Sequence, residues 1–147
     1  MLFRTFLAPT SFVAAVIWTI WAQAAEPITV LAPFNLTGPQ AVLGAPCYKG
    51  AELAVEKLNA AGGVLSRPIE LIPIDTASQV SRTTNELEGA LERYPNATAG
   101  IGHTDSTYAL DAGRVFQKAG IRFITPGATA PDLHQVGRLR SSRSTMV

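Results

Sequence analysis

Apolar positions between residues 27 and 131 follow two alternating periods. Continuous apolar runs, which are typical of buried strands, occur at 28–34, 69–74, 97–102 and 121–124. Apolar residues spaced three or four apart, which are typical of helices, occur at 47–61, 78–94 and 106–119. Three successive strand–helix–strand units predict a parallel sheet with both faces covered by helices. The expected fold class is therefore α/β, as a three-layer, parallel-sheet unit.

Each predicted helix presents one apolar face. The expected sets are Ala51, Ala54, Leu58 and Ala61 on one face of the first helix; Val80, Thr84, Leu87, Leu91 and Tyr94 facing inward on the second; and Ala109, Ala112, Phe116 and Ala119 buried on the third. Gly62-Gly63 is expected to end the first helix, because glycine adopts the left-handed conformation that helix ends use. Pro73 predicts an edge strand, because proline cannot donate to a sheet.

The ends of the chain differ from this central pattern. Residues 1–24 combine one early charge, Arg4, with a long apolar run. The run ends in Ala22-Gln23-Ala24, which has the small-x-small pattern of a signal-peptidase cleavage site. These features predict a cleaved secretory signal peptide. A membrane anchor is the competing interpretation, because the apolar run approaches the roughly 18 residues that a span needs. Residues 25–136 form the predicted domain. Residues 137–147 shift abruptly to Arg and Ser, which predicts a disordered or out-of-frame tail.

Composition and charge limit the partners, metals and cofactors that we expect. The net charge of +1 and the mixed acidic and basic residues predict no binding to nucleic acid. With one cysteine, Cys47, and two histidines, we expect neither an intramolecular disulfide nor a metal site. Gly100-Ile101-Gly102 lacks the third glycine of a dinucleotide fingerprint, so no cofactor is predicted.

Two loops of small residues carry the candidate chemistry. Residues 102–107 and 125–131 each follow a predicted strand, and open α/β sheets bind ligands at that edge. Residues 37–39 form a matching loop after the first strand. Ser106 and Thr107 stand at the start of the third helix, where free N–H groups favour an anion. Ser106 either caps this helix or donates to a ligand, and the residue types alone leave both roles open.

An enzyme is not expected. His103, Asp105 and Ser106 suggest a secreted serine hydrolase as an alternative, but no G-x-S-x-G segment exposes a nucleophile. We expect His103 to be a hydrogen-bonded residue at the edge of the sheet.

These residues together resemble the branched-chain amino acid-binding periplasmic proteins. The resemblance lies in 35–39 (Asn-Leu-Thr-Gly-Pro), 50–55, 58–64 (Leu-Asn-Ala-Ala-Gly-Gly-Val), Gly102-His103 with Ser106, and 124–133 (Ile-Thr-Pro-Gly-Ala-Thr-Ala-Pro-Asp-Leu). It implies a type I periplasmic binding-protein fold, in which two hinged α/β lobes close on a solute for an ABC importer and its membrane permease.

The resemblance also implies roles for individual residues. Ser106 and Thr129 would donate to the solute carboxylate, and the carbonyl of Gly127 would accept from its amino group. Leu43 stands where some members carry an aromatic residue against the solute side chain. Ser78 and Asp105 stand where some members form a disulfide, so that covalent link is absent here.

The chain is much shorter than this family, so we expect a truncated first lobe that binds its solute weakly. Branched-chain amino acids and related small amides are the expected solutes, and the periplasm is the expected location. A ligand-sensing ectodomain of the same fold is the alternative function.

Overall fold

The computed structural model describes residues 26–133, so the predicted signal peptide (1–24) and tail (137–147) lie outside the described residues. The elements in chain order are β1 (Ile28–Phe34), α1 (Ala41–Ala60), β2 (Ile69–Asp75), α2 (Val80–Arg93), β3 (Ala99–Ile101), α3 (Ser106–Ala119) and β4 (Arg122–Ile124). All neighbouring strands pair in parallel, in the order β2-β1-β3-β4. The predicted α/β class with a parallel sheet is confirmed.

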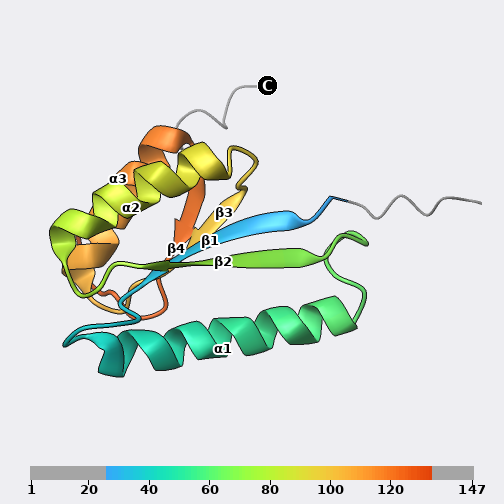
Figure 1. Cartoon of the computed structure of the whole chain (residues 1–147), viewed down its shortest axis with the longest axis horizontal. Helices are drawn as coiled ribbons and strands as arrows, with labels where there is room; N and C mark the ends of the chain where they lie inside the picture. Colours follow the sequence, from blue (N-terminus) through green and yellow to red (C-terminus); the bar gives the residue numbers. More distant parts are fainter. Residues whose placement is uncertain (1–25, 134–147) are drawn as a thin grey trace, which may run out of the picture.

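Helices lie on both faces of the sheet (Figure 1). The α1 helix runs along one face, below β1 and β2, whereas α2 and α3 lie side by side on the other face. This arrangement is the predicted three-layer unit. Pro73 lies in β2, which is an edge strand as the proline predicted.

The start of α1 differs from the prediction. The helix begins at Ala41 and continues through Pro46, whereas the apolar pattern placed its start at Cys47. Pro46 lies in the second turn, inside the helix, where proline removes one backbone hydrogen bond and is disfavoured. Gly62 and Gly63 follow the last turn with φ of 101° and 77°, so the predicted glycine termination is confirmed.

The predicted face of α1 is wrong. Ala54, Leu58 and Ala61 are exposed, and the face toward the sheet carries Gly44 and Tyr48 instead. The Tyr48 ring meets Phe34 of β1 edge-on, with the centroids 6.0 Å apart. Because α1 is apolar on several sides, spacing alone did not identify the side that the sheet covers.

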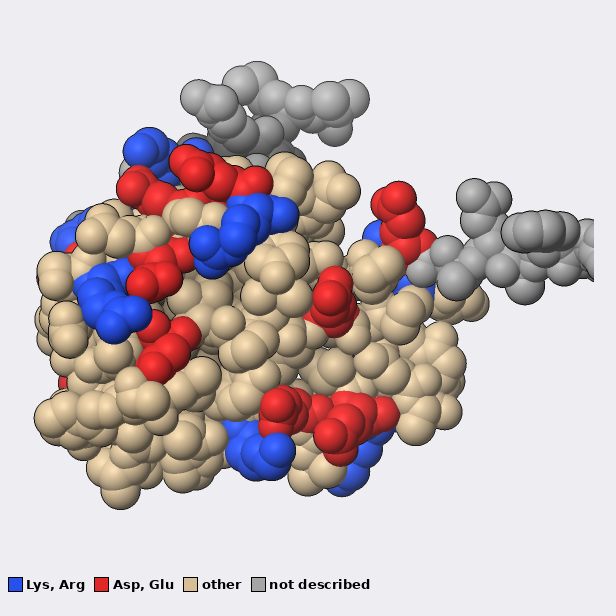
Figure 2. Space-filling view, in the orientation of Figure 1, with Lys and Arg blue, Asp and Glu red and all other residues tan. Residues whose placement is uncertain are grey.

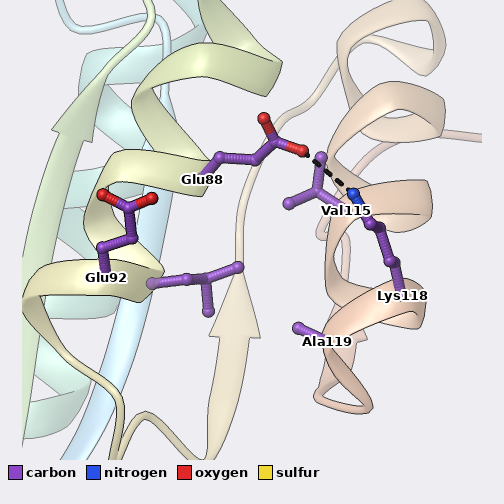
Figure 3. Close-up of a pocket in the computed structure, with 6 residues that line it drawn as sticks. Glu88, Glu92, Val115, Lys118 and Ala119 are labelled. Carbon is purple, nitrogen blue, oxygen red and sulfur yellow. Dashed lines mark ion pairs between the residues drawn. The ribbon is translucent and has the colours of Figure 1, made fainter.

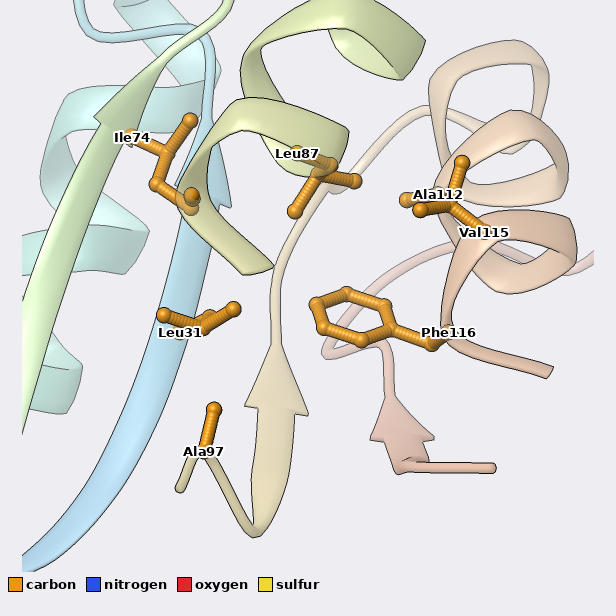
Figure 4. Close-up of a cluster of buried hydrophobic side chains, with 8 residues drawn as sticks. Leu31, Ile74, Leu87, Ala97, Ala112, Val115 and Phe116 are labelled. Carbon is orange, nitrogen blue, oxygen red and sulfur yellow. The ribbon is translucent and has the colours of Figure 1, made fainter. Parts of the chain in front are cut away.

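The core lies between the sheet and the pair α2 and α3 (Figure 4). Its buried members are Leu31, Ile74, Leu87, Ala90, Ala97, Ala112, Val115 and Phe116. The predicted buried residues Ala109, Ala112 and Phe116 are confirmed, whereas Ala119 is exposed in the last turn of α3. On α2, Thr83 is buried where the pattern predicted Thr84.

The surface is mixed in charge. Acidic and basic side chains are interspersed over the helices on the face shown in Figure 2. Among the described residues, no helix is both long and apolar enough to cross a membrane.

Candidate functional site

Four loops follow the carboxyl ends of the strands, and all lie at the same edge because the strands are parallel. They are residues 35–40, 76–79, 102–105 and 125–131. This edge is where open α/β sheets bind ligands. The hydrogen bonds below show that the loops form one connected rim.

Asp75 joins the first two loops. Its Oδ1 accepts from the N–H groups of Leu36 (3.0 Å), Thr37 (3.1 Å) and Ala77 (2.8 Å). Its Oδ2 accepts from the Thr37 hydroxyl at 2.6 Å. Burial raises the pKa of this carboxyl, but the hydrogen bonds from Thr37, Ala77 and Leu36 outweigh burial and the net pKa is lowered. The carboxylate therefore stays ionised and holds the 35–40 loop in place.

Ser78 and Tyr108 extend this connection to α3. The Ser78 hydroxyl donates to the carbonyl of Thr37 (2.8 Å) and accepts from the N–H of Gln40 (2.9 Å). The Tyr108 hydroxyl donates to the carbonyl of Ser78 at 2.9 Å. Hydrogen bonds thus connect the second loop to α3, near the place where the resemblance placed a disulfide in other members.

Asp105 caps α3. Its side chain accepts from the N–H of Thr107 at 2.8 Å, and its backbone is extended as an N-cap requires. The hypothesis that Ser106 caps this helix is therefore wrong. Thr107 itself is exposed, and its N–H is already used by the cap.

Ser106 instead binds the loop after β4. Its Oγ accepts from the N–H groups of Thr129 and Ala130, each at 3.2 Å. Gly127 approaches the 102–105 loop closely, since a Cβ on it would lie 3.3 Å from the carbonyl oxygen of Thr104. The structure thus brings three of the predicted residues, Ser106, Gly127 and Thr129, to adjoining loops.

Leu43 comes from another part of the rim. It lies in the first turn of α1, on the opposite face of the sheet from α3, and is 52% exposed. Within residues 26–133, no hydrogen bond joins Leu43, or the Thr107 side chain, to the pair Ser106 and Thr129.

His103 lies at the predicted sheet edge, but its ring is not hydrogen-bonded as expected. The side chain is 1% exposed, and neither ring nitrogen has a partner in the part of the chain that the structure describes. Burial lowers its pKa to about 4, against a smaller opposing effect of the Asp105 carboxylate. The ring packs between Phe34 and Tyr108, where the sheet edge is apolar, and this packing replaces the expected hydrogen bond.

The hydrolase alternative needs a hydrogen bond between Ser106 and His103. Both ring nitrogens of His103 are buried without partners among the described residues, and the Ser106 hydroxyl binds the N–H groups of Thr129 and Ala130 instead. The nucleophile–base pair that this chemistry requires is therefore not formed in this arrangement.

Comparison with known proteins identifies the family to which the chain belongs. A family model described as periplasmic binding protein matches residues 27–138. The chain belongs to this periplasmic binding protein family. It is 35% identical over 101 residues to an amino acid binding protein of Pseudomonas aeruginosa, covering 69% of this chain and 27% of that protein. It is 32% identical over 124 residues to the Leu/Ile/Val-binding protein of Escherichia coli K12, covering 82% of this chain and 32% of that protein.

A solved structure of the periplasmic binding protein family shows the same fold. The branched-chain amino acid transporter substrate binding protein of Streptococcus pneumoniae, in complex with isoleucine, superimposes with a TM-score of 0.69 at 30% identity. The match covers 74% of this chain and 31% of that chain. The chain thus spans between 27% and 32% of the length of these relatives, and it corresponds to part of one lobe of the family fold.

A separate depression lies between the outer sides of α2 and α3 (Figure 3). It is lined by Glu88, Leu91, Glu92, Val115, Lys118 and Ala119, and an ion pair of 3.5 Å joins Glu88 and Lys118 across it. Lys118 stands three helical turns after Ser106, roughly 18 Å along the α3 axis. This depression is therefore distinct from the rim formed by the strand ends.

Sequence reasoning did not find the roles of Asp75 and Tyr108. Asp75 is the last residue of β2, and an acidic residue before a loop of small polar residues is a signal of carboxylate–backbone bonding. Tyr108 gave no such signal, because its partner lies 30 residues away in the chain.

Proposed function

We propose that the chain is the solute-binding part of an ABC importer for branched-chain amino acids or related small amides. In this proposal it is exported to the periplasm, residues 1–24 are removed as a signal peptide, and it works as a binding protein with a membrane permease, not as an enzyme. Membership of the periplasmic binding protein family supports this proposal, as do relatives named for Leu/Ile/Val binding.

The main support for the proposal is the hydrogen bonding of the Ser106 hydroxyl. The N–H groups of Thr129 and Ala130 occupy the two acceptor positions of Oγ, which leaves its proton as the free donor. A donor at the first residue of a helix, beside small-residue loops, suits a solute carboxylate.

The remaining contacts follow from the same rim. Thr129 is exposed and offers a second hydroxyl to the carboxylate, and the Gly127 carbonyl accepts from the solute amino group. Thr107 lies beside Ser106 and adds a further exposed hydroxyl. Leu43 contributes an exposed apolar surface for the solute side chain.

Residues 26–133 supply the contacts of one lobe only, so we propose that this polypeptide binds weakly by itself. If a closed two-lobe site bound at micromolar affinity, about 8 kcal/mol, then the loss of a few kcal/mol would bring the affinity to millimolar. The solute would lose the counter-charge for its amino group and would stay open to water.

The test is calorimetry with leucine, isoleucine, valine and short amides, together with amide NMR of the labelled chain at millimolar solute. We expect dissociation constants weaker than roughly 10 μM. We also expect shifts centred on the amides of Ser106, Gly127 and Thr129. Ser106→Ala should abolish these shifts, whereas Ser81→Ala, on the exposed side of α2, should not. Tighter binding would refute weak affinity, and shifts elsewhere would refute the site.

A further inference from the structure

His103 combines an uncommon backbone conformation with full burial of its ring. Its φ is +51°, in the left-handed region, which glycine, asparagine, aspartate and histidine adopt more often than other residues do. The side chain is 1% exposed, and within residues 26–133 both ring nitrogens are buried without a hydrogen-bond partner. Native proteins pair nearly all buried polar atoms, and strained residues of this kind gather at functional sites.

The contacts of His103 connect its own loop to β1, to the 125–131 loop and, through Tyr108, to the 76–79 loop. Its N–H donates to the carbonyl of Pro33 at 3.1 Å, and its carbonyl accepts from the Thr125 hydroxyl at 2.5 Å. Its ring stacks on Tyr108, with centroids 5.4 Å apart and an interplanar angle of 25°. Tyr108 in turn holds the 76–79 loop through the carbonyl of Ser78.

We propose that His103 is a positioning residue for the solute site, and that its ring must stay neutral for Ser106 to hold the loop that carries Thr129. This inference rests on the proposed function. The backbone connects His103 to the site on two sides. His103 stands three residues before Ser106 in the chain. Its carbonyl accepts from the hydroxyl of Thr125, which stands four residues before Thr129. A change in the ring is therefore transmitted to both sides of the Ser106–Thr129 contact.

The surroundings explain why a charged ring is not tolerated. From β1 the ring meets Phe34, which is apolar, and from α3 it meets Tyr108, whose hydroxyl is already donated to Ser78. Asp105 is the charged group that acts on the ring, and its Oδ1 is engaged by the N–H of Thr107. A protonated ring has two N–H donors, and in the described structure neither ring nitrogen lies within hydrogen-bond distance of an acceptor. To find one, the ring must move toward water or toward the Asp105 carboxylate, which disturbs the stack.

The experiment is an NMR pH titration of the labelled chain between pH 7.5 and 3.5, without solute and with millimolar leucine. Wild type is expected to show the Thr129 and Ala130 amides shifting with the same midpoint as the His103 ring, while the Leu87 amide in α2 stays constant. Solute affinity should fall at least tenfold over the same range. In His103→Gln, which has no titrating ring, both the amide shifts and the loss of affinity should be absent around the pH at which the wild-type ring titrates.

His103→Phe keeps an aromatic stack without a proton to gain, and it serves as the second variant if the glutamine variant does not fold. The proposal would be overturned if either folded variant showed the same acid-dependent amide shifts and the same loss of solute affinity as wild type. Thr129 and Ala130 amides that stay constant while the ring titrates would overturn it as well. A wild type that binds no solute at pH 7.5 is a failure of the proposed function, because the amide readout needs no solute.

Discussion

Asp75 and His103 lie at the same edge of the sheet, but the fold treats these two ionisable side chains in opposite ways. Asp75 accepts four hydrogen bonds, which lower its pKa against the opposing effect of burial. The His103 ring has no hydrogen-bond partner in the part of the chain that the structure describes, so burial dominates and lowers its pKa to about 4. One residue is held in its charged form and the other in its neutral form, and both conditions are met at neutral pH.

Acid should therefore destabilise the chain in two stages. The folded-state pKa of His103 lies below its ordinary value of 6.5, so its contribution is fully present above pH 6.5 and is lost as the pH falls toward about 4. This loss corresponds to roughly 3 kcal/mol of unfolding free energy. The contribution of Asp75 is present above its ordinary pKa of 3.8 and is lost below it.

Urea unfolding at a series of pH values measures this dependence. His103→Gln should remove the slope between pH 6.5 and 4 and keep the loss at lower pH. A wild-type unfolding free energy that stays constant from pH 7 to 4 would contradict the assignment.

At the scale of elements, close backbone approach decides where helices and loops can lie. The α1 helix begins against the loop after β1, and Gly44 is its buried contact point. A Cβ on Gly44 would collide with the carbonyl of Asn35. The β1 and β2 strands pair over their full length, from Ile28 with Ile69 to Phe34 with Asp75, which places the 35–40 and 76–79 loops side by side.

The same substitution at two positions of α1 should have opposite effects. Gly44→Ala should destabilise the chain by about 1–3 kcal/mol, because a backbone atom cannot move aside for the added methyl group. Gly50→Ala meets nothing within 4 Å and should stabilise the chain by about 0.5–1 kcal/mol through helix propensity. Thermal unfolding of both variants gives the comparison, and equal effects would show that α1 does not approach Asn35 as described.

The connection that Asp75 makes between the 35–40 and 76–79 loops can be tested by substitutions in β2. Asp75→Asn removes the negative charge and one acceptor oxygen, and it should cost about 1–3 kcal/mol of unfolding free energy. Glu70→Gln is the matched control, because Glu70 is exposed on the same strand. Hydrogen exchange at the amides of Leu36 and Thr37 should increase only in Asp75→Asn, and equal exchange in the two variants would contradict this role.

At the scale of the whole molecule, the two faces of the sheet are covered unequally within residues 26–133. The α2 and α3 helices cover one face, where Phe123 of β4 stacks on Phe116 with centroids 5.0 Å apart. On the other face α1 lies along β1 and β2, and Ile124 of β4 is 67% exposed. Ile124 is therefore an apolar side chain that water reaches within the described residues, whereas Phe123 packs on α3.

Adjacent residues of β4 should therefore respond differently to a charge. Phe123→Lys places a charge against Phe116 and should cost about 3 kcal/mol or more, enough to unfold much of the population. Ile124→Lys should change stability by less than about 0.5 kcal/mol and reduce self-association. Circular dichroism and sedimentation velocity measure the two effects. Unfolding by Ile124→Lys would show that this face is covered in solution.

The sequence predicted most of the fold because its signals are local. The bounds of β1 and α3 match the predicted ranges, since an apolar run and a clear helical period mark them. The prediction was wrong for the start and the inward face of α1, where Pro46 and the apolar residues on several sides gave conflicting signals. At the site, the choice of the two small-residue loops was local, whereas the partners of Ser106 were not. The Asp105 cap is also local, because Thr107 lies two residues away, but the prediction named only Ser106 for this role.

The amino-acid sequence by itself therefore determined the α/β class, the order of elements and the loops that gather at one edge, because these follow from spacing along the chain. Tertiary structure alone decided that Ser106 binds the loop of Thr129 and that Asp75 joins the first two loops. It also decided that His103 is buried and that, within the described range 26–133, its ring has no hydrogen bond. The physical reason is that hydrogen bonds and burial depend on neighbours brought from 20 to 40 residues away, which spacing along the chain does not encode.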